Sequence, residues 1–329
     1  MKRAKEPTER NMKRIVLIAL LVALALLVCA SCAPAQGENK TSHANTGVAL
    51  AAAAETEKRS EPDIDALFAA RVNRPALPPG RKQDDIICTD YTDIGLLRIC
   101  YQSDSDARLK LQVLKDGNSI AYNLKGDGSI EDFSLQYGSG KYTARIMQNI
   151  KNDEYFVVTA KTFTVSLKDE NAVYLNSIQN VDWDYSKKPI QDVPYLVSDA
   201  LIGLEDAQLL SGCTDELYNF VVTHIAYDSA KVFNLMYDYL PDIEKTYLEQ
   251  TGICYDYASL FAAMLCSIGI PAKLVKGYSK ENPGVYHAWN EVLINGNWIV
   301  VDTTLDASQP SKDAQMSKKP ADYMKVYEY

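Results

Sequence analysis

The stretch of sequence that decides the fold reads GICYDYASLFAAML and runs from Gly252 to Leu265. From Ala258 onward it is rich in strong helix formers, which predicts a helix, and Cys254 stands at the start of that helix, just after a glycine. The first N–H groups of a helix have no partner within the helix, and the helix dipole is positive at that end, so both favour an anion. The pattern therefore places Cys254 where the reactive form of a cysteine, the thiolate, is best stabilised.

A β-hairpin is predicted downstream of this helix. Two runs of alternating apolar residues flank the dipeptide Asn295-Gly296, which is the strongest short-range signal for a hairpin. With this dipeptide at the turn, His287 pairs near Thr304, and Asp302 becomes its diagonal neighbour on the same face of the sheet. A carboxylate next to a histidine fixes its tautomer and stabilises the imidazolium. The hairpin therefore brings a base and its orienting group together.

Cys254, His287 and Asp302 provide the nucleophile, base and orienting group that cysteine acyl transfer needs. Each residue alone has a plainer interpretation, since a cysteine that opens a helix is usually a packing residue. Their joint appearance, at spacings of 33 and 15 residues, favours a catalytic role. A zinc site is the weaker interpretation because no close-spaced ligand pair and no fourth ligand accompany these residues. We therefore expect no metal and no cofactor.

Residues 252–304 resemble the core of the bacterial transglutaminase-like superfamily. Four motifs carry the resemblance: Gly-x-Cys at the helix start, Leu-x-Ser-x-Gly-Ile-Pro-Ala-Lys over 265–273, His-Ala-Trp-Asn-Glu-Val over 287–292, and Trp-x-x-x-Asp-x-Thr over 298–304. The resemblance covers residues 193–310. The sequence departs from the family pattern at Cys266, where arginine is common, and at Thr303, where proline is common.

The resemblance implies a papain-like α+β fold, in which the helix that bears Cys254 packs on an antiparallel sheet that bears His287 and Asp302. It also implies that these three residues are the catalytic triad of a cysteine acyltransferase or peptidase acting on protein or peptide amides. Transfer of the acyl group to an amine would give an isopeptide crosslink, and transfer to water would give proteolysis or deamidation. The alternative is a non-catalytic protein that uses the same fold to bind peptides or cell-wall material.

The chain begins with a basic segment, followed by an uncharged apolar run of 14 residues from Ile15 to Val28. A membrane-spanning helix needs about 20 residues, so this run indicates an export signal. The next residues, Cys29-Ala30-Ser31-Cys32, resemble bacterial lipoprotein signals, which implies a signal over 1–32 and a lipid on Cys32. An uncleaved anchor and an ordinary cleaved signal are the alternatives. Each of them places the body outside the cytoplasm, attached to a bacterial membrane or secreted.

The rest of the chain divides by composition. Residues 33–84 are small, polar and rich in turn formers, which predicts a flexible tether. Residues 85–183 hold alternating, β-branched runs separated by glycine-containing turns, which predicts a small β-sandwich-like module. Residues 184–192 are expected to be a linker and residues 193–329 the catalytic domain.

Helical periodicity begins at Val193 and predicts helices over 193–210 and 213–225. The second of these contains His224. A lone histidine in such a helix is more often a packing residue than a ligand. A short helix is also compatible with residues 63–72.

The formal net charge is −9 at pH 7, and because the segment before Cys32 is basic, the rest of the chain is more acidic than this total. An acidic body without a basic stripe argues against nucleic-acid binding, so the expected partners are a protein or peptide substrate and, through the lipid, a membrane. Five cysteines lie beyond the signal. An odd number in an exported protein leaves at least one thiol unpaired, and Cys254 is the natural candidate. Cys88 and Cys100 either bridge a strand pair or both stay reduced.

Overall fold

The computed structural model describes residues 62–78, 85–309 and 315–329. The signal predicted over 1–32, with Cys32, and the predicted tether as far as residue 61 lie outside the described residues. The described residues all lie within one compact unit, Ser60–Tyr329. Within the described ranges, no helix is long and apolar enough to span a membrane.

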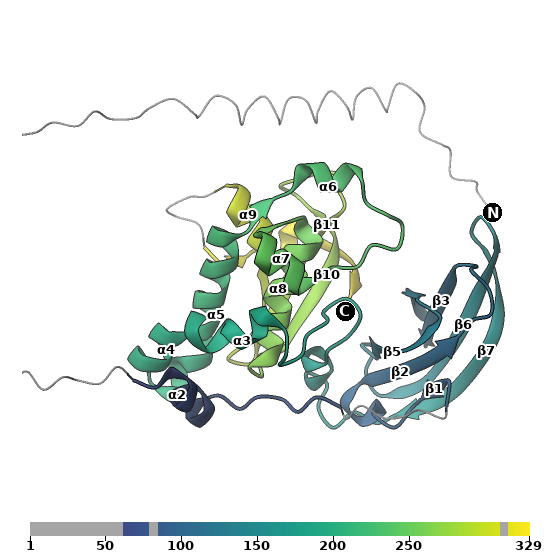
Figure 1. Ribbon diagram of the computed structural model, residues 1–329, viewed down its shortest axis with the longest axis horizontal. Helices are drawn as coiled ribbons and strands as arrows, with labels where there is room; N and C mark the ends of the chain where they lie inside the picture. The colour runs from purple at the N-terminus through teal and green to yellow at the C-terminus, as the bar shows by residue number, and fades with distance from the viewer. Residues whose placement is uncertain (1–61, 79–84, 310–314) are drawn as a thin grey trace, which may run out of the picture. The chain divides into compact units, whose positions relative to one another are not determined.

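Two antiparallel sheets build the first part of this unit (Figure 1). One sheet has the strand order β1-β2-β5 and the other β4-β3-β6-β7. The bounds are Ile87–Cys88 (β1), Leu96–Gln102 (β2), Leu109–Lys115 (β3), Asn118–Leu124 (β4), Asp127–Ser134 (β5), Gly140–Lys151 (β6) and Glu154–Val165 (β7). Strand β3 shows the period of two, because Leu109, Leu111 and Val113 are buried and the residues between them are less so. The predicted all-β module is therefore confirmed.

Residues 62–78 are packed, in contrast to the predicted tether over 33–84, and they include the short helix with which residues 63–72 are compatible. Helix α2 (Ile64–Arg71) begins where the Asp63 carboxylate accepts a hydrogen bond from the Ala66 N–H at 3.1 Å. Phe68 is buried, and the Arg71 guanidinium forms an ion pair with Asp206 at 2.7 Å. Residues 62–78 therefore belong to the compact unit, because α2 carries an apolar side chain into the core.

Helices dominate the second part of the unit. Their bounds are Lys188–Leu196 (α3), Ser198–Gly203 (α4), Asp206–His224 (α5), Ser229–Phe233 (α6), Ile243–Glu249 (α7), Cys254–Ser267 (α8) and Thr303–Ser308 (α9). The predicted break at residues 211–212 is wrong, since both residues lie inside α5. Gly212 serves close packing there, because a Cβ at this position would lie 2.1 Å from the Leu204 side chain.

A five-stranded antiparallel sheet lies in the same part, with the order β13-β12-β11-β10-β14. The bounds are Ala272–Ser279 (β10), His287–Ile294 (β11), Asn297–Val301 (β12), Ser317–Lys318 (β13) and Tyr323–Glu328 (β14). The register of the hairpin formed by β11 and β12 is the predicted one, with Asn290 opposite Val301 and Ile294 opposite Asn297.

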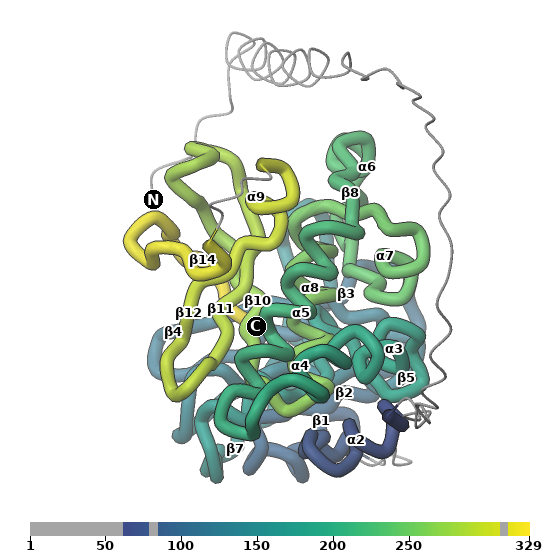
Figure 2. Tube along the Cα trace, turned by 90° about the vertical axis from the view of Figure 1, so that its left-hand side faces the viewer, coloured from purple at the N-terminus to yellow at the C-terminus, as the bar shows by residue number. Residues whose placement is uncertain are grey.

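Helix α8 packs against β10 and β11, and both Figure 1 and Figure 2 show it alongside β10. Its side chains are buried on all sides after the first residue. The Asn290 side chain on β11 donates a hydrogen bond to the Ala258 carbonyl of the helix at 2.9 Å. The predicted α+β arrangement, with the cysteine helix on an antiparallel sheet, is therefore confirmed. A short parallel pair, β8 (Ala226–Tyr227) and β9 (Thr251–Gly252), precedes the helix.

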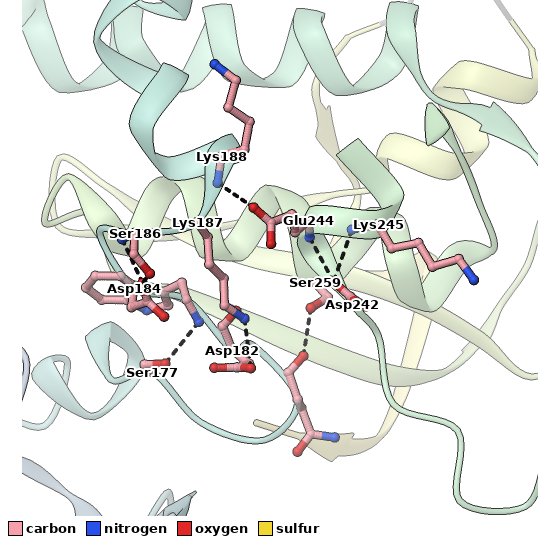
Figure 3. Close-up of polar contacts among 12 residues, drawn as sticks. Ser177, Asp182, Asp184, Ser186, Lys187, Lys188, Asp242, Glu244, Lys245 and Ser259 are labelled. Atoms are coloured by element: carbon pink, nitrogen blue, oxygen red, sulfur yellow. Dashed lines mark hydrogen bonds and ion pairs between the residues drawn. The ribbon is translucent and has the colours of Figure 1, made fainter. Parts of the chain in front are cut away.

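The loop before α3 is fixed against helices α7 and α8 (Figure 3). Ser259 on α8 donates a hydrogen bond to the Asn180 carbonyl at 2.9 Å, and the Lys188 N–H donates to Glu244 on α7 at 3.0 Å. The linker predicted over 184–192 is shorter than expected, because α3 begins at Lys188. Pro189 in its first turn explains this start, since proline lacks an N–H and its φ suits the first helical positions.

Candidate active site

Cys254 is the first residue of α8, and its neighbours in the chain hold that turn in place. The Asp256 carboxylate accepts a hydrogen bond from the Ile253 N–H at 2.9 Å, which satisfies a donor at the helix start. A Cβ on Gly252 would lie 2.7 Å from the Asp256 Cβ, so only glycine fits before the cysteine. The Gly-x-Cys spacing is therefore a packing requirement as well as a sequence motif.

Asp256 is fully buried and has further donors from outside its own helix. The Lys231 ammonium lies 2.7 Å from its carboxylate, and the Tyr239 hydroxyl donates a short hydrogen bond to it. Lys231 also lies over the Tyr239 ring, 4.7 Å from its centroid. A buried carboxylate is stable only when its charge is paired and hydrogen-bonded, so this set fixes the entry to α8.

His287 and Asp302 form a direct contact. The Nε2 atom of His287 lies 2.8 Å from Oδ2 of Asp302, and the two residues are 7% and 1% exposed. Because Nε2 is occupied, Nδ1 is the nitrogen left for the Cys254 thiol, with which the imidazole also interacts. The structure therefore brings together the three residues that the sequence singles out.

The charge of His287 is set by these two partners. Burial lowers the pKa of the imidazole, but the hydrogen bonds with Asp302 and Cys254 outweigh burial and raise the pKa to about 10. The imidazolium is therefore the favoured form at neutral pH. A cation next to the Cys254 sulfur is the partner that an ionised nucleophile requires.

Asp302 is oriented by contacts that the sequence interpretation missed. Its Oδ1 accepts a hydrogen bond from the Leu305 N–H at 3.0 Å, and its Oδ2 accepts one from the Tyr323 hydroxyl at 3.0 Å. The predicted pairing of His287 near Thr304 is not formed, because the register between β11 and β12 stops at Asn290 and Val301. Strand β12 ends at Val301 because Asp302 caps helix α9. The capping pattern of an aspartate followed by a short helix was the available signal.

The strands around His287 hold its ring in place. Trp289 stacks on the imidazole with 6.3 Å between ring centroids, and Tyr323 packs against Trp289 at 5.0 Å. Opposite His287, Gly277 allows β14 to approach, since a Cβ there would lie 2.1 Å from the Met324 carbonyl oxygen. The positions of the base and of Asp302 therefore both depend on β14.

The other described cysteines differ from Cys254. All five are free thiols, so Cys88 and Cys100 are not bridged. Burial raises the pKa of Cys213 and of Cys266 to about 12, whereas Cys254 is half-buried beside His287. Cys254 is the thiol among them that combines access with a basic partner.

The lipid attachment site predicted at Cys32 is outside the described residues. His224 is exposed at the end of α5 and stacks on Phe220, with 4.6 Å between ring centroids. Its ring serves local packing.

Residues 203–303 match the family model of the transglutaminase-like superfamily, and this range contains Cys254, His287 and Asp302. The chain therefore carries a transglutaminase-like core.

Similar solved structures include a candidate cysteine protease from Cytophaga hutchinsonii, at 18% identity and a TM-score of 0.30, covering 71% of this chain and 76% of that one. LapG from Legionella pneumophila has 14% identity and a TM-score of 0.32, covering 43% and 72%. Red sea bream transglutaminase has 12% identity and a TM-score of 0.29, covering 64% and 48%. The comparison with curated proteins gives no match.

Proposed function

We propose that this protein is a cysteine acyltransferase or peptidase that acts on protein or peptide amides through Cys254, His287 and Asp302. The observation that carries the proposal is the 2.8 Å contact between His287 and Asp302, which leaves the other imidazole nitrogen for Cys254. This geometry lies within the segment that matches the transglutaminase-like superfamily.

The first half of the reaction forms a thioester. The Cys254 thiolate attacks the amide carbonyl carbon, a C–S bond forms, and the carbonyl electron pair moves to oxygen. When this tetrahedral intermediate collapses, the C–N bond breaks, and the His287 imidazolium gives its proton to the departing amine. Asp302 keeps the imidazole in the orientation that this transfer needs.

The second half releases the acyl group. Neutral His287 removes a proton from water or from a primary amine, which attacks the thioester carbonyl, and the C–S bond then breaks. Water gives hydrolysis, and an amine gives an isopeptide bond. The negatively charged oxygen of each tetrahedral intermediate needs hydrogen-bond donors. The Cys254 N–H can be one of them, because the first N–H groups of a helix have no partner within the helix.

We also propose that the enzyme works outside the cytoplasm, attached to a bacterial membrane through a lipid on Cys32. Substrates would then be proteins or peptides near the cell surface, including those of the cell wall. The support is the sequence alone: a basic start, an apolar run of 14 residues and small residues before Cys32. Replacing Cys32 with alanine should move the protein from the membrane fraction to the soluble exported fraction, and unchanged membrane attachment would contradict the lipid.

Acyl-enzyme trapping tests the chemistry. The full chain is incubated with a panel of peptide amides, and intact-mass spectrometry followed by proteolysis locates any added acyl group. We expect the acyl mass on Cys254, with Cys254→Ala as the variant that gains none. Adding a fluorescent primary amine separates transfer from hydrolysis. Full activity in Cys254→Ala on a substrate that the wild type processes would reject the mechanism.

A further inference from the structure

Lys276 carries an ammonium group that lies over the ring of Tyr255, the residue after Cys254, and its charge interacts with that of Cys254. It lies on β10, and its Nζ is 3.4 Å from the centroid of the Tyr255 ring and 5.2 Å from that of Tyr329. Tyr255 follows Cys254 directly in the chain. Lys276 pairs with Ala288 on β11, so its side chain lies on the face of the sheet that packs against α8, the face on which Asn290 contacts the helix.

This lysine differs from Lys273 on the same strand and from Lys280, which directly follows the strand. Lys273 lies 3.5 Å from both Glu291 and Glu328, and Lys280 lies 2.6 Å from Asp322. Within residues 62–78, 85–309 and 315–329, no carboxylate lies within ion-pair distance of the Lys276 ammonium. Its charge is therefore not neutralised by these parts of the chain.

The balance of charge around Cys254 is therefore positive. His287 has Asp302 as its counter-ion, whereas the group whose charge acts on Lys276 is Cys254 itself. Burial lowers the pKa of Lys276 to about 8, against the opposing effect of Cys254, so the ammonium stays mostly protonated at pH 7. The Tyr255 ring stabilises a cation but does not cancel its charge. A desolvated ammonium without a counter-ion favours an incoming anion.

We propose that Lys276 is a specificity-determining residue that binds a carboxylate of the substrate, next to the carbonyl carbon that Cys254 attacks. The preferred substrates are then peptides whose reacting acyl group carries a free carboxylate close to the scissile amide. This inference rests on the proposed function, because it takes Cys254 as the nucleophile.

Two alkylating reagents test it without knowledge of the substrate. Iodoacetate and iodoacetamide both form a C–S bond with a thiolate and release iodide, but iodoacetate carries a carboxylate on the reacting carbon where iodoacetamide carries a neutral amide. Rates at Cys254 are measured at pH 7 on the full chain by mass spectrometry, for the wild type and for Lys276→Met, Lys276→Gln and Lys276→Arg. The quantity compared is the ratio of the iodoacetate rate to the iodoacetamide rate.

We expect this ratio to fall about tenfold in Lys276→Met and Lys276→Gln and to stay within about twofold of wild type in Lys276→Arg. Attraction by His287 is common to all four proteins and cancels in the comparison. The matched control is Lys280→Met, which removes the lysine that directly follows β10 and already has Asp322 as its counter-ion, and we expect it to leave the ratio unchanged.

The possible failures are distinguishable. If both reagents modify Cys254 and the ratio is the same in the wild type and in folded Lys276→Met and Lys276→Gln, the inference is wrong and the proposed nucleophile stands. If neither reagent modifies Cys254 in the native protein, although both do so after unfolding, the proposed function fails and the inference fails with it.

Discussion

Helix α8 carries a cysteine near each of its ends, and their surroundings are opposite. Cys254 is the first residue of the helix, is half-buried, and lies beside His287 and Lys276. Cys266, near the last turn, is 1% exposed, and its thiol donates to the Tyr174 carbonyl at 3.1 Å. Burial raises the pKa of Cys266 to about 12, so its thiolate is strongly disfavoured.

The difference teaches that position and partners decide the role of a thiol within one helix. The amino end of a helix favours an anion and the carboxyl end disfavours one, so the dipole acts in opposite directions on the two sulfurs. The charges of His287 and Lys276 favour the thiolate of Cys254 further. Burial in the core disfavours the thiolate of Cys266 further.

Replacing each of the two cysteines with alanine, one at a time, should give the largest difference in activity between the two ends of α8. Cys254→Ala should lower kcat by at least about 10⁴-fold, because it removes the sulfur that forms the thioester in the proposed mechanism. Cys266→Ala should keep activity within about twofold and lower the free energy of unfolding by about 1 kcal/mol, because it removes a buried atom away from the chemistry. Turnover of a peptide amide and urea unfolding measure the two effects. Equal activity losses in both variants would remove the distinction between the two ends.

Asp302→Asn removes the carboxylate that orients His287, the basic partner of Cys254. We expect kcat to fall by about 10³-fold or more, because the imidazolium loses its negative partner and the amide no longer fixes the tautomer. The asparagine oxygen can still accept from the Leu305 N–H, so α9 should keep its cap. Circular dichroism checks the fold, and an activity close to wild type would show that Asp302 is structural only.

The charge of His287 predicts how stability depends on pH. The pKa of His287 is raised from 6.5 to about 10 in the folded protein, so the imidazolium stabilises the fold fully below pH 6.5. This contribution is lost as the pH rises through about 10. His287→Gln should therefore cost more free energy of unfolding at pH 6 than at pH 10, by at least about 1 kcal/mol. Urea unfolding of both proteins at the two pH values measures this difference, and the reverse order would contradict the raised pKa.

Much of the site was predictable from sequence because its geometry is local. The turn at Asn295-Gly296 fixes the register of β11 and β12, and that register brings Asp302 close to His287. The start of α8 at Cys254 was marked by a preceding glycine and a run of helix formers. Short-range sequence patterns therefore predict most of the geometry of the candidate triad.

The parts that sequence missed depend on contacts between distant segments. Lys276 was interpreted only as part of a strand, and its position over Tyr255 depends on how that strand packs on α8. A short helix over 63–72 is compatible with the sequence, but the small, polar residues around it predict a tether, and no local pattern indicates that Phe68 enters the core. The C-terminal strand β14 pairs with β10, and no local pattern near residue 323 indicates that partner.

Tyr323 on β14 gives the smallest and most specific test. Its hydroxyl donates to the same oxygen of Asp302 that contacts His287, and burial together with Asp302 raises the pKa of this tyrosine, so the hydroxyl stays protonated and remains a donor. Tyr323→Phe should lower kcat by about fivefold, since one hydrogen bond contributes about 1 kcal/mol and the ring packing on Trp289 is kept. The alkylation rate of Cys254 should fall together with kcat, because an Asp302 side chain that has lost one of its donors orients the imidazolium beside the thiolate less firmly. Tyr323→Phe should not change the alkylation rate of Cys266, at the far end of α8, when that rate is measured after partial unfolding. A loss in Tyr323→Phe as large as that in Asp302→Asn would mean that β14 builds the site rather than orienting one of its members.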